Sequence, residues 1–191
     1  GAFASVNSGT VLRNHVAAFN LTTGLATSFN PNANDWVYSL SFFGSSLYVG
    51  GILSGFNAVV RNNIAAIDSS SGAVTSFNPN IDSSVLGLFL SNNILYVAGS
   101  FSTVNSNVTR NNLAAFDINT GLVTNFNPNL NDVATSLQLS GGVLYVGGYF
   151  TMVNGVTTRN RLAAFDISTS LATSFNPNVN DGVNTFLISG S

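Results

Sequence analysis

The sequence predicts an all-β fold, a β-propeller built from four-stranded blades of about 49 residues. Three observations support this prediction. An arginine and an Asn-Pro-Asn tripeptide both recur at intervals of 48, 49 and 49 residues. Each interval contains short apolar runs separated by turn residues, and no segment shows the 3.6-residue period of an amphipathic helix. The arginines are Arg13, Arg61, Arg110 and Arg159, and the tripeptides begin at Asn30, Asn78, Asn127 and Asn176.

The expected strands occupy the same places in each repeat. Residues 16–19 form the first clear strand, a turn at Thr22-Thr23-Gly24 follows, and residues 25–29 return. A polar pair followed by glycine suits a hairpin that closes on a left-handed residue, and Ser170 replaces this glycine in the fourth copy, which weakens that turn. Asn-Pro-Asn ends the strand, because proline donates no ladder hydrogen bond. Further strands are expected at 37–42 and 47–49, 85–90 and 95–97, 133–139 and 144–146, and 183–188.

Together the repeats predict a single domain over residues 1–191. Its repeats span about 1–35, 36–83, 84–132 and 133–181, and another begins at 182–191. A β-solenoid is the alternative, although the regular turns favour strands that pair within one repeat. Aligning the copies leaves five residues absent between the two ends, those matching residues 143–147. We therefore expect a segment of a longer array, or a strand supplied by a neighbouring chain, rather than a self-contained monomer.

Two recurring apolar positions are expected to form the layer between neighbouring blades. They are Phe29, Phe77, Phe126 and Phe175 at one position, and Phe19, Ile67, Phe116 and Phe165 at the other. The run 133–139 and its counterparts have the fewest polar residues and should lie nearest the propeller axis. Trp36 and Tyr38 occur in one copy only. We expect them to be buried, whereas exposed rings could stack on a sugar.

The run from Gly148 to Pro177, GYFTMVNGVTTRNRLAAFDISTSLATSFNP, resembles the delta-sixty repeat, a bacterial β-propeller repeat of large secreted and cell-surface proteins. The matching elements are Gly-x-Phe-Thr-x-Val-Asn-Gly, Arg-Asn-Arg-Leu-Ala and Thr-Ser-Phe-Asn-Pro, and the resemblance extends over every repeat. The chain departs from the family at Ala26, Val74, Val123 and Ala172, where the family often has aspartate. The resemblance implies a propeller at an extracellular or cell-surface location, and it implies no reaction.

The composition narrows the classes of partner. Charged residues make up 6% of the chain, with five arginines, seven aspartates and no lysine, glutamate or cysteine. Scattered arginines in a chain of net charge −2 form no basic stripe, so nucleic-acid binding is not expected. No run approaches the ~20 apolar residues of a membrane helix. A surface rich in asparagine, serine and threonine is more typical of an extracellular protein.

Few residues have the chemistry that catalysis requires. His15 is the only histidine, so a Ser-His-Asp triad would depend on it alone, and we expect an exposed loop residue. Repeated aspartates could in principle form the carboxylate pair of a glycosidase, but a residue that recurs once per repeat is more simply a turn acceptor. One set is Asp68, Asp117 and Asp166, with Asn20 in the first copy, and the other is Asp35, Asp82, Asp132 and Asp181.

Two weaker patterns concern ligands and modification. Asp117-x-Asn119-x-Gly121 faintly resembles a calcium loop but lacks the closing glutamate. No cofactor is expected, with calcium as the alternative. Asn20 and Asn107 begin glycosylation sequons.

The recurring arginines are expected to be partly buried and hydrogen-bonded to aspartates or turn carbonyls of an adjacent repeat. The function expected from these observations is a non-enzymatic extracellular module that acts in scaffolding, adhesion or self-assembly. Its partners would be further copies or domains of the same assembly, or glycans. The alternative is a carbohydrate-binding module that uses blade loops and Trp36. An enzyme domain is disfavoured by the single histidine and the absence of glutamate and cysteine.

Overall fold

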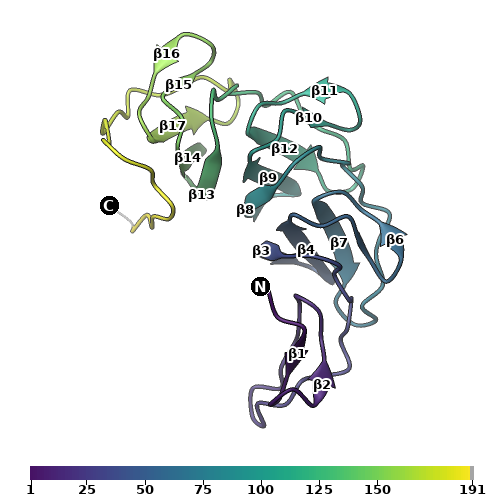
Figure 1. Ribbon diagram of the computed structural model, residues 1–191. Coiled ribbons are helices and arrows are strands. Elements are labelled where there is room, and N and C mark those ends of the chain that lie inside the picture. Colours follow the sequence, from purple (N-terminus) through teal and green to yellow (C-terminus); the bar gives the residue numbers. More distant parts are fainter. Residues whose placement is uncertain (190–191) are drawn as a thin grey trace.

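A computed structural model describes residues 1–189, and this part of the chain is all β, with no helix (Figure 1). The all-β prediction is therefore confirmed. Three antiparallel sheets of three strands follow one another along the chain. The first contains β3 (Val37–Phe43), β4 (Ser46–Gly51) and β7 (Ile64–Asp68), the second β8 (Val85–Ser91), β9 (Ile94–Gly99) and β12 (Leu113–Asp117), and the third β13 (Ala134–Ser140), β14 (Val143–Gly148) and β17 (Leu162–Asp166).

The three sheets share one register. In each, the first strand pairs with the second across a short turn and the second pairs with the third. The first strand has a register shift at the same place in every copy, for example between Val37 and Ser39. A single β-bridge, such as Phe116 to Val123, stands where a fourth strand is expected. Equivalent residues thus adopt equivalent backbone positions, as the repeat predicts.

Some expected strands are not formed. Residues 16–19 and 25–29 make only the bridge between Phe19 and Ala26, and residues 183–188 adopt no regular structure. Residues 16–19 and 183–188 lack the partner that β4, β9 or β14 provides in the other copies. Residues 25–29 occupy the fourth-strand place, which forms a single bridge in every copy. Segments for which no strand is expected, in contrast, contain hairpins of two-residue strands. These are β1 (Ser5–Val6) with β2 (Val11–Leu12), β5 (Gly55–Phe56) with β6 (Val59–Val60), β10 (Thr103–Val104) with β11 (Val108–Thr109), and β15 (Met152–Val153) with β16 (Thr157–Thr158).

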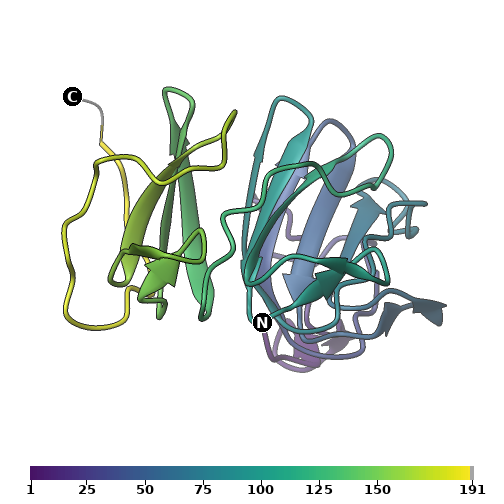
Figure 2. The same ribbon diagram turned by 90° about the horizontal axis from the view of Figure 1, so that it is seen from above.

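The sheets stand side by side in an open arc, with β3, β8 and β13 along its inner side (Figure 1). Strand β8 contacts both β3 and β13, and the backbone N–H of Leu88 in β8 donates to Ser39 Oγ in β3 at 3.0 Å. Residues 1–29 form one end of the arc. At the other end, the segment that follows residue 181 lies beside the face of the third sheet that points away from the second sheet (Figure 2), with Val183 against Gly147 of β14.

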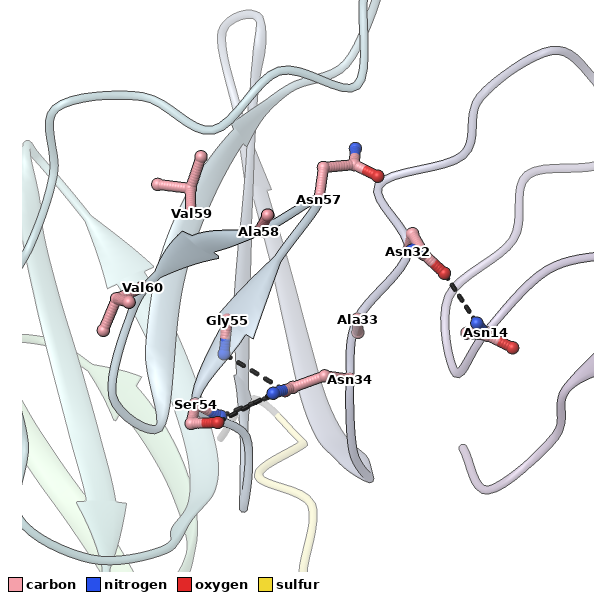
Figure 3. Close-up of a pocket in the computed structure, with 10 residues that line it drawn as sticks. All are labelled: Asn14, Asn32, Ala33, Asn34, Ser54, Gly55, Asn57, Ala58, Val59 and Val60. Atoms are coloured by element: carbon pink, nitrogen blue, oxygen red, sulfur yellow. Dashed lines mark hydrogen bonds between the residues drawn. The ribbon is translucent and has the colours of Figure 1, made fainter.

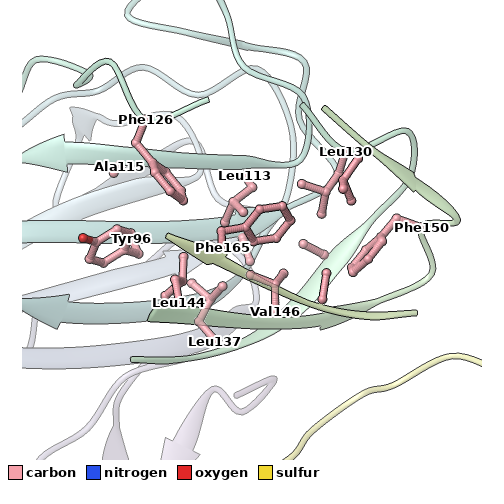
Figure 4. Close-up of a cluster of buried hydrophobic side chains, with 14 residues drawn as sticks. Tyr96, Leu113, Ala115, Phe126, Leu130, Leu137, Leu144, Val146, Phe150 and Phe165 are labelled. Carbon is pink, nitrogen blue, oxygen red and sulfur yellow. The ribbon is translucent and has the colours of Figure 1, made fainter. Parts of the chain in front are cut away.

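Buried side chains fill the spaces between successive sheets. One cluster joins the second and third sheets and includes Tyr96, Phe126, Leu144 and Phe165 (Figure 4). Similar clusters join the first sheet to the second and the N-terminal segment to the first sheet. Burying a phenylalanine contributes about 1.5–3 kcal/mol. Because every cluster draws on two successive repeats, each repeat depends on its neighbour for a core.

The turns use left-handed residues at recurring positions. Gly24, Gly72 and Gly121 have φ of +68°, +74° and +71°, and Ser170 adopts +64° at the same place. A second left-handed position is occupied by Asn63, Asn112, His15 and Arg161, with φ between 62° and 65°. Asparagine tolerates this conformation better than other non-glycine residues. At this position, therefore, Asn63 and Asn112 fit their backbone, and His15 and Arg161 adopt it at a cost.

We expect His15→Asn to stabilise the protein by roughly 0.5–1 kcal/mol, because asparagine relieves the backbone strain of a left-handed histidine. Asn112 also donates from Nδ2 to the carbonyl of Leu130 at 3.0 Å, a bond that an asparagine at position 15 could reproduce within its own copy. The reciprocal change, Asn112→His, should destabilise by a similar amount or more. Thermal melts of both variants check the pair, and an unchanged or lowered melting temperature for His15→Asn would contradict the argument.

Candidate functional site

The four recurring arginines have the same partners in each repeat. Arg110 donates from Nη2 to the carbonyl of Thr124 at 2.7 Å and from Nη1 to the carbonyl of Thr109 at 2.8 Å. The guanidinium groups of Arg13, Arg61 and Arg159 make the same two bonds to equivalent carbonyls. All four side chains are half-buried. The acceptors belong to the same repeat as the arginine, so the expectation of aspartates or an adjacent repeat is corrected.

The first set of aspartates caps the turns that follow β7, β12 and β17. One carboxylate oxygen of Asp117 accepts hydrogen bonds from the backbone N–H groups of Asn119 and Thr120 at 2.9 and 3.0 Å. Asp68 and Asp166 accept the equivalent backbone bonds and additional serine hydroxyl bonds. In the first copy the amide oxygen of Asn20 accepts the same two bonds. The carboxylates thus hold the backbone of their own turns.

Acidification should destabilise the protein through two of these turns. Hydrogen bonds from the Ser70 hydroxyl and the Ser71 backbone lower the pKa of Asp68, and bonds from the Ser168 hydroxyl and the Thr169 backbone lower that of Asp166. Because the folded-state pKa lies below the unfolded value of about 3.9, the stabilisation is present above that pH. It is lost as the pH falls through the folded-state pKa. We expect the melting temperature to decrease below about pH 4.

Substitution tests the same linkage. Asp68→Asn with Asp166→Asn should weaken the decrease of melting temperature between pH 5 and pH 2, because an amide does not titrate there. Asn20 already fills the equivalent turn with a neutral acceptor, so the variant should remain folded. The control is Asp181→Asn, whose carboxylate bonds only the next N–H. An identical pH dependence for the double variant and the wild type would refute the role of these two groups.

The second set of aspartates does not form one structural position. Asp82 accepts from the backbone N–H and hydroxyl of Ser102 at 2.9 and 2.6 Å, and Asn34 and Asn131 bond the equivalent residues in their repeats. Asp35, Asp132 and Asp181 lie one residue later and bond the next N–H. Burial acts to raise the pKa of Asp82, but the hydrogen bonds from Ser102 and Thr103 outweigh it, and the pKa is lowered.

Four hydrogen-bonded asparagine pairs, one in each repeat, were not predicted from the sequence. Each recurring arginine is followed by an asparagine whose Nδ2 donates to Oδ1 of the last residue of Asn-Pro-Asn. The pairs are Asn14 with Asn32, Asn62 with Asn80, Asn111 with Asn129 and Asn160 with Asn178, at 2.6–2.7 Å. The sequence does contain a signal for these pairs, since the dipeptide Arg-Asn recurs at the same place in all four copies.

A polar cavity of about 330 Å³ lies between the N-terminal segment and the β5–β6 hairpin (Figure 3). Its lining includes Asn14, Asn34, Ser54 and Asn57. Most of their polar atoms already bond to protein, since Asn34 Oδ1 accepts from the backbone N–H groups of Ser54 and Gly55 at 3.1 Å and Asn14 donates to Asn32. The lining carries no titratable side chain. This cavity can offer hydrogen bonds to a ligand but no acid, base or nucleophile.

His15 and the asparagines of both glycosylation sequons lie outside the strands. Nδ1 of His15 lies 3.1 Å from the carbonyl oxygen of Gly1, at a half-buried turn. Asn20 and Asn107 are exposed. Among residues 1–189, no group of three or more histidine or acidic side chains is placed to hold a metal ion. The same residues include no helix with the length and hydropathy of a membrane span.

Trp36 and Tyr38 are exposed, which corrects the expectation of burial. Their exposed fractions are 48% and 45%, and the two rings meet edge to face with centroids 6.3 Å apart. Strand β8 is covered by β3 and β4 of the preceding sheet, whereas the N-terminal segment has no three-stranded sheet to cover β3. The burial of these rings therefore depends on a neighbour that the described residues do not supply.

These features define an all-β repeat protein whose charged side chains mainly bond its own backbone. Two computationally designed proteins have similar structures. The Ika8 protein is 14% identical with a TM-score of 0.58, and the match covers 96% of this chain and 45% of that one. The Ika4 protein is 15% identical with a TM-score of 0.52, over 78% and 77% of the two chains. The chain thus spans less than half of the Ika8 protein, and such low identities show the fold alone.

Comparison with family models and with curated protein sequences gave no match.

Proposed function

We propose that the chain is a non-enzymatic extracellular module, built of propeller blades like those of the delta-sixty repeat, that acts in scaffolding, adhesion or self-assembly. The observation that supports this proposal most is the use of its recurring charged groups. The guanidinium groups bond backbone carbonyls, and the carboxylates of Asp68, Asp117 and Asp166 bond backbone N–H groups. Charged groups that are hydrogen-bonded to the backbone stabilise the repeats. The chain would therefore act through contacts of its surface and not through a reactive centre.

The arrangement of the sheets supports the propeller part of the proposal. Three of the repeats each contribute three antiparallel strands and a bridge at the fourth place, and the first strand of each lies on the inner side of an arc. Sheets that face one another around a common axis bury their faces mutually, as the shared clusters do here. A crystal structure of the chain, alone or with any partner that it binds, tests this arrangement directly.

Display on cells tests the proposed role. Bacterial cells that carry residues 1–191 on their surface should attach to one another or to a solid support more strongly than cells that display an unrelated β-domain of similar size. The expected attachment needs no added metal or small substrate. Equal attachment of the two cell types would argue against a scaffolding or adhesive role.

A carbohydrate-binding module is the second candidate, and the exposure of Trp36 and Tyr38 favours it. An exposed aromatic face can stack on the apolar face of a sugar ring. Glycan-array binding that is lost in Trp36→Ala and kept in Phe43→Ala, a matched change of an exposed ring at the far end of β3, would support this candidate. An array with no binding for the wild type would remove it.

A further inference from the structure

The two ends of the arc expose the same positions that are buried between the sheets. An edge-to-face pair of a tyrosine and a phenylalanine recurs in each repeat, as Tyr48 with Phe77, Tyr96 with Phe126 and Tyr145 with Phe175. Their ring centroids are 5.4, 5.6 and 5.3 Å apart. Phe77 and Phe126 are each 6% exposed, whereas Phe175 is 39% exposed. The last pair has the geometry of the buried pairs, but Phe175 is exposed and Tyr145 partly exposed, while Val183 of the following segment packs against Gly147 beside them.

The buried pairs show what normally covers such a pair. Tyr48 and Phe77 share a cluster with Phe116 of the next repeat, and Tyr96 and Phe126 share one with Phe165. Phe116 and Phe165 are fully buried. The equivalent residue in the first repeat is Phe19, which is 45% exposed. One end of the arc thus presents the pair, and the other end presents the residue that packs on it.

The surroundings of Phe19 extend this exposed surface. Leu40 and Phe42 of β3 are 52% and 61% exposed, although their counterparts Leu88 and Leu90 in β8 are only partly exposed under the preceding sheet. A cavity of about 230 Å³ lies between Phe19 and Leu40. We name Phe19, Tyr38, Leu40 and Phe42 the leading face, and Tyr145 with Phe175 the trailing face.

We propose that two copies of this chain associate head to tail, with the trailing face of one copy packed on the leading face of the next. This inference rests on the proposed role of the chain as a self-assembling module. The occupant is a second copy because the contact already exists twice within the chain, between the same residue types in the same geometry. Neither face contains a charged side chain, so no charge repulsion opposes the contact. The Ika8 match, which uses 45% of that protein, indicates that this fold can continue beyond the length of one such chain.

The contact is heterologous, since it joins two different faces. Such contacts form rings when the rotation closes and open chains when it does not. They differ from a two-fold contact in one measurable respect. A copy blocked at its leading face still offers a trailing face, so two copies blocked at opposite faces can form one contact and no more.

The experiment uses Phe175→Asp to block the trailing face and Phe19→Asp to block the leading face, each measured by sedimentation equilibrium over a concentration series. We expect the wild type to self-associate and each variant to associate at least about 30-fold more weakly, as for loss of a 2 kcal/mol interface residue. Mixed in equal amounts, the two variants should form a 1:1 dimer and nothing larger. Leu122→Asp, a change of a similarly exposed residue outside both faces, should behave as the wild type.

Thermal melts and Leu40→Asp separate a blocked face from a misfolded chain, since Leu40→Asp should also be monomeric and should also dimerise with Phe175→Asp. A monomeric wild type would overturn the proposal, and so would a mixture of variants that stays monomeric. Association that Phe175→Asp does not weaken would indicate a two-fold contact through the leading face and would equally overturn it. If displayed cells still adhere in any of these cases, the proposed function stands without the head-to-tail contact.

Discussion

Gly50→Ala should destabilise the protein by about 2 kcal/mol, and the same change should cost far less when Val85 is also alanine. A Cβ at position 50 would lie 2.4 Å from Cγ1 of Val85 in the next sheet, much closer than van der Waals contact. Val85 is fully buried and β-branched, so its side chain has little freedom to move away. The new methyl group must therefore displace one sheet from the next, or strain the valine.

Two residue combinations occur at this contact between successive sheets, glycine facing valine and alanine facing alanine. Gly147 faces Val183 in the same way as Gly50 faces Val85. At the intermediate position the glycine is replaced by Ala98, and the residue in the place of Val85 is Ala134, in the same buried cluster. Gly50→Ala with Val85→Ala reproduces this alanine pair at the first interface.

Urea unfolding of the two single variants and the double variant measures the coupling. Val85→Ala alone should also cost about 2 kcal/mol through the cavity that it leaves. The double variant should then be less destabilised than the sum of the single changes by roughly 2 kcal/mol. Strictly additive costs would mean that the two residues do not compete for the same space.

Much of the fold follows from the sequence because the repeat fixes which residues are equivalent. The strand expected at residues 85–90 forms at Val85–Ser91, and the glycines of the turns are left-handed as expected. The expected strands that do not form are those that need a pairing partner from elsewhere in the chain. Residues 16–19 have the same apolar pattern as β7, but β7 is a strand because β4 lies beside it. Pairing is a tertiary property that a local pattern cannot contain.

Among the site residues, local contacts could likewise be predicted from the sequence and tertiary contacts could not. Turn carboxylates were predictable, because Asp117 bonds residues two and three positions away. Asp82 was misplaced by one residue, because aspartates were matched by residue type although Asp82 lies two residues after its Asn-Pro-Asn tripeptide and the other three lie three residues after theirs. The exposure of Trp36 could not be predicted, because it depends on which sheet covers β3.

Arg110→Ala should destabilise the protein by about 1–3 kcal/mol, the range for hydrogen bonds from a charged donor. The guanidinium bridges the carbonyls of Thr109 and Thr124, which lie in β11 and in the segment after β12. It thus joins the short hairpin to the outer edge of the sheet through a contact that no backbone pairing replaces. Burial lowers the pKa of Arg110, which remains protonated over the whole range in which the protein would be studied.

Two further substitutions separate the causes of this loss. Arg110→Lys keeps the charge but lacks the planar fork that reaches both carbonyls, so we expect it to recover only part of the stability. Arg110→Met keeps most of the apolar stem and should be nearly as destabilised as alanine if the hydrogen bonds dominate. Urea unfolding of the three variants ranks the contributions. Full stability in Arg110→Met would show that the arginine acts through packing, and an unchanged unfolding midpoint in Arg110→Ala would show that the carbonyl bridge contributes nothing to the fold.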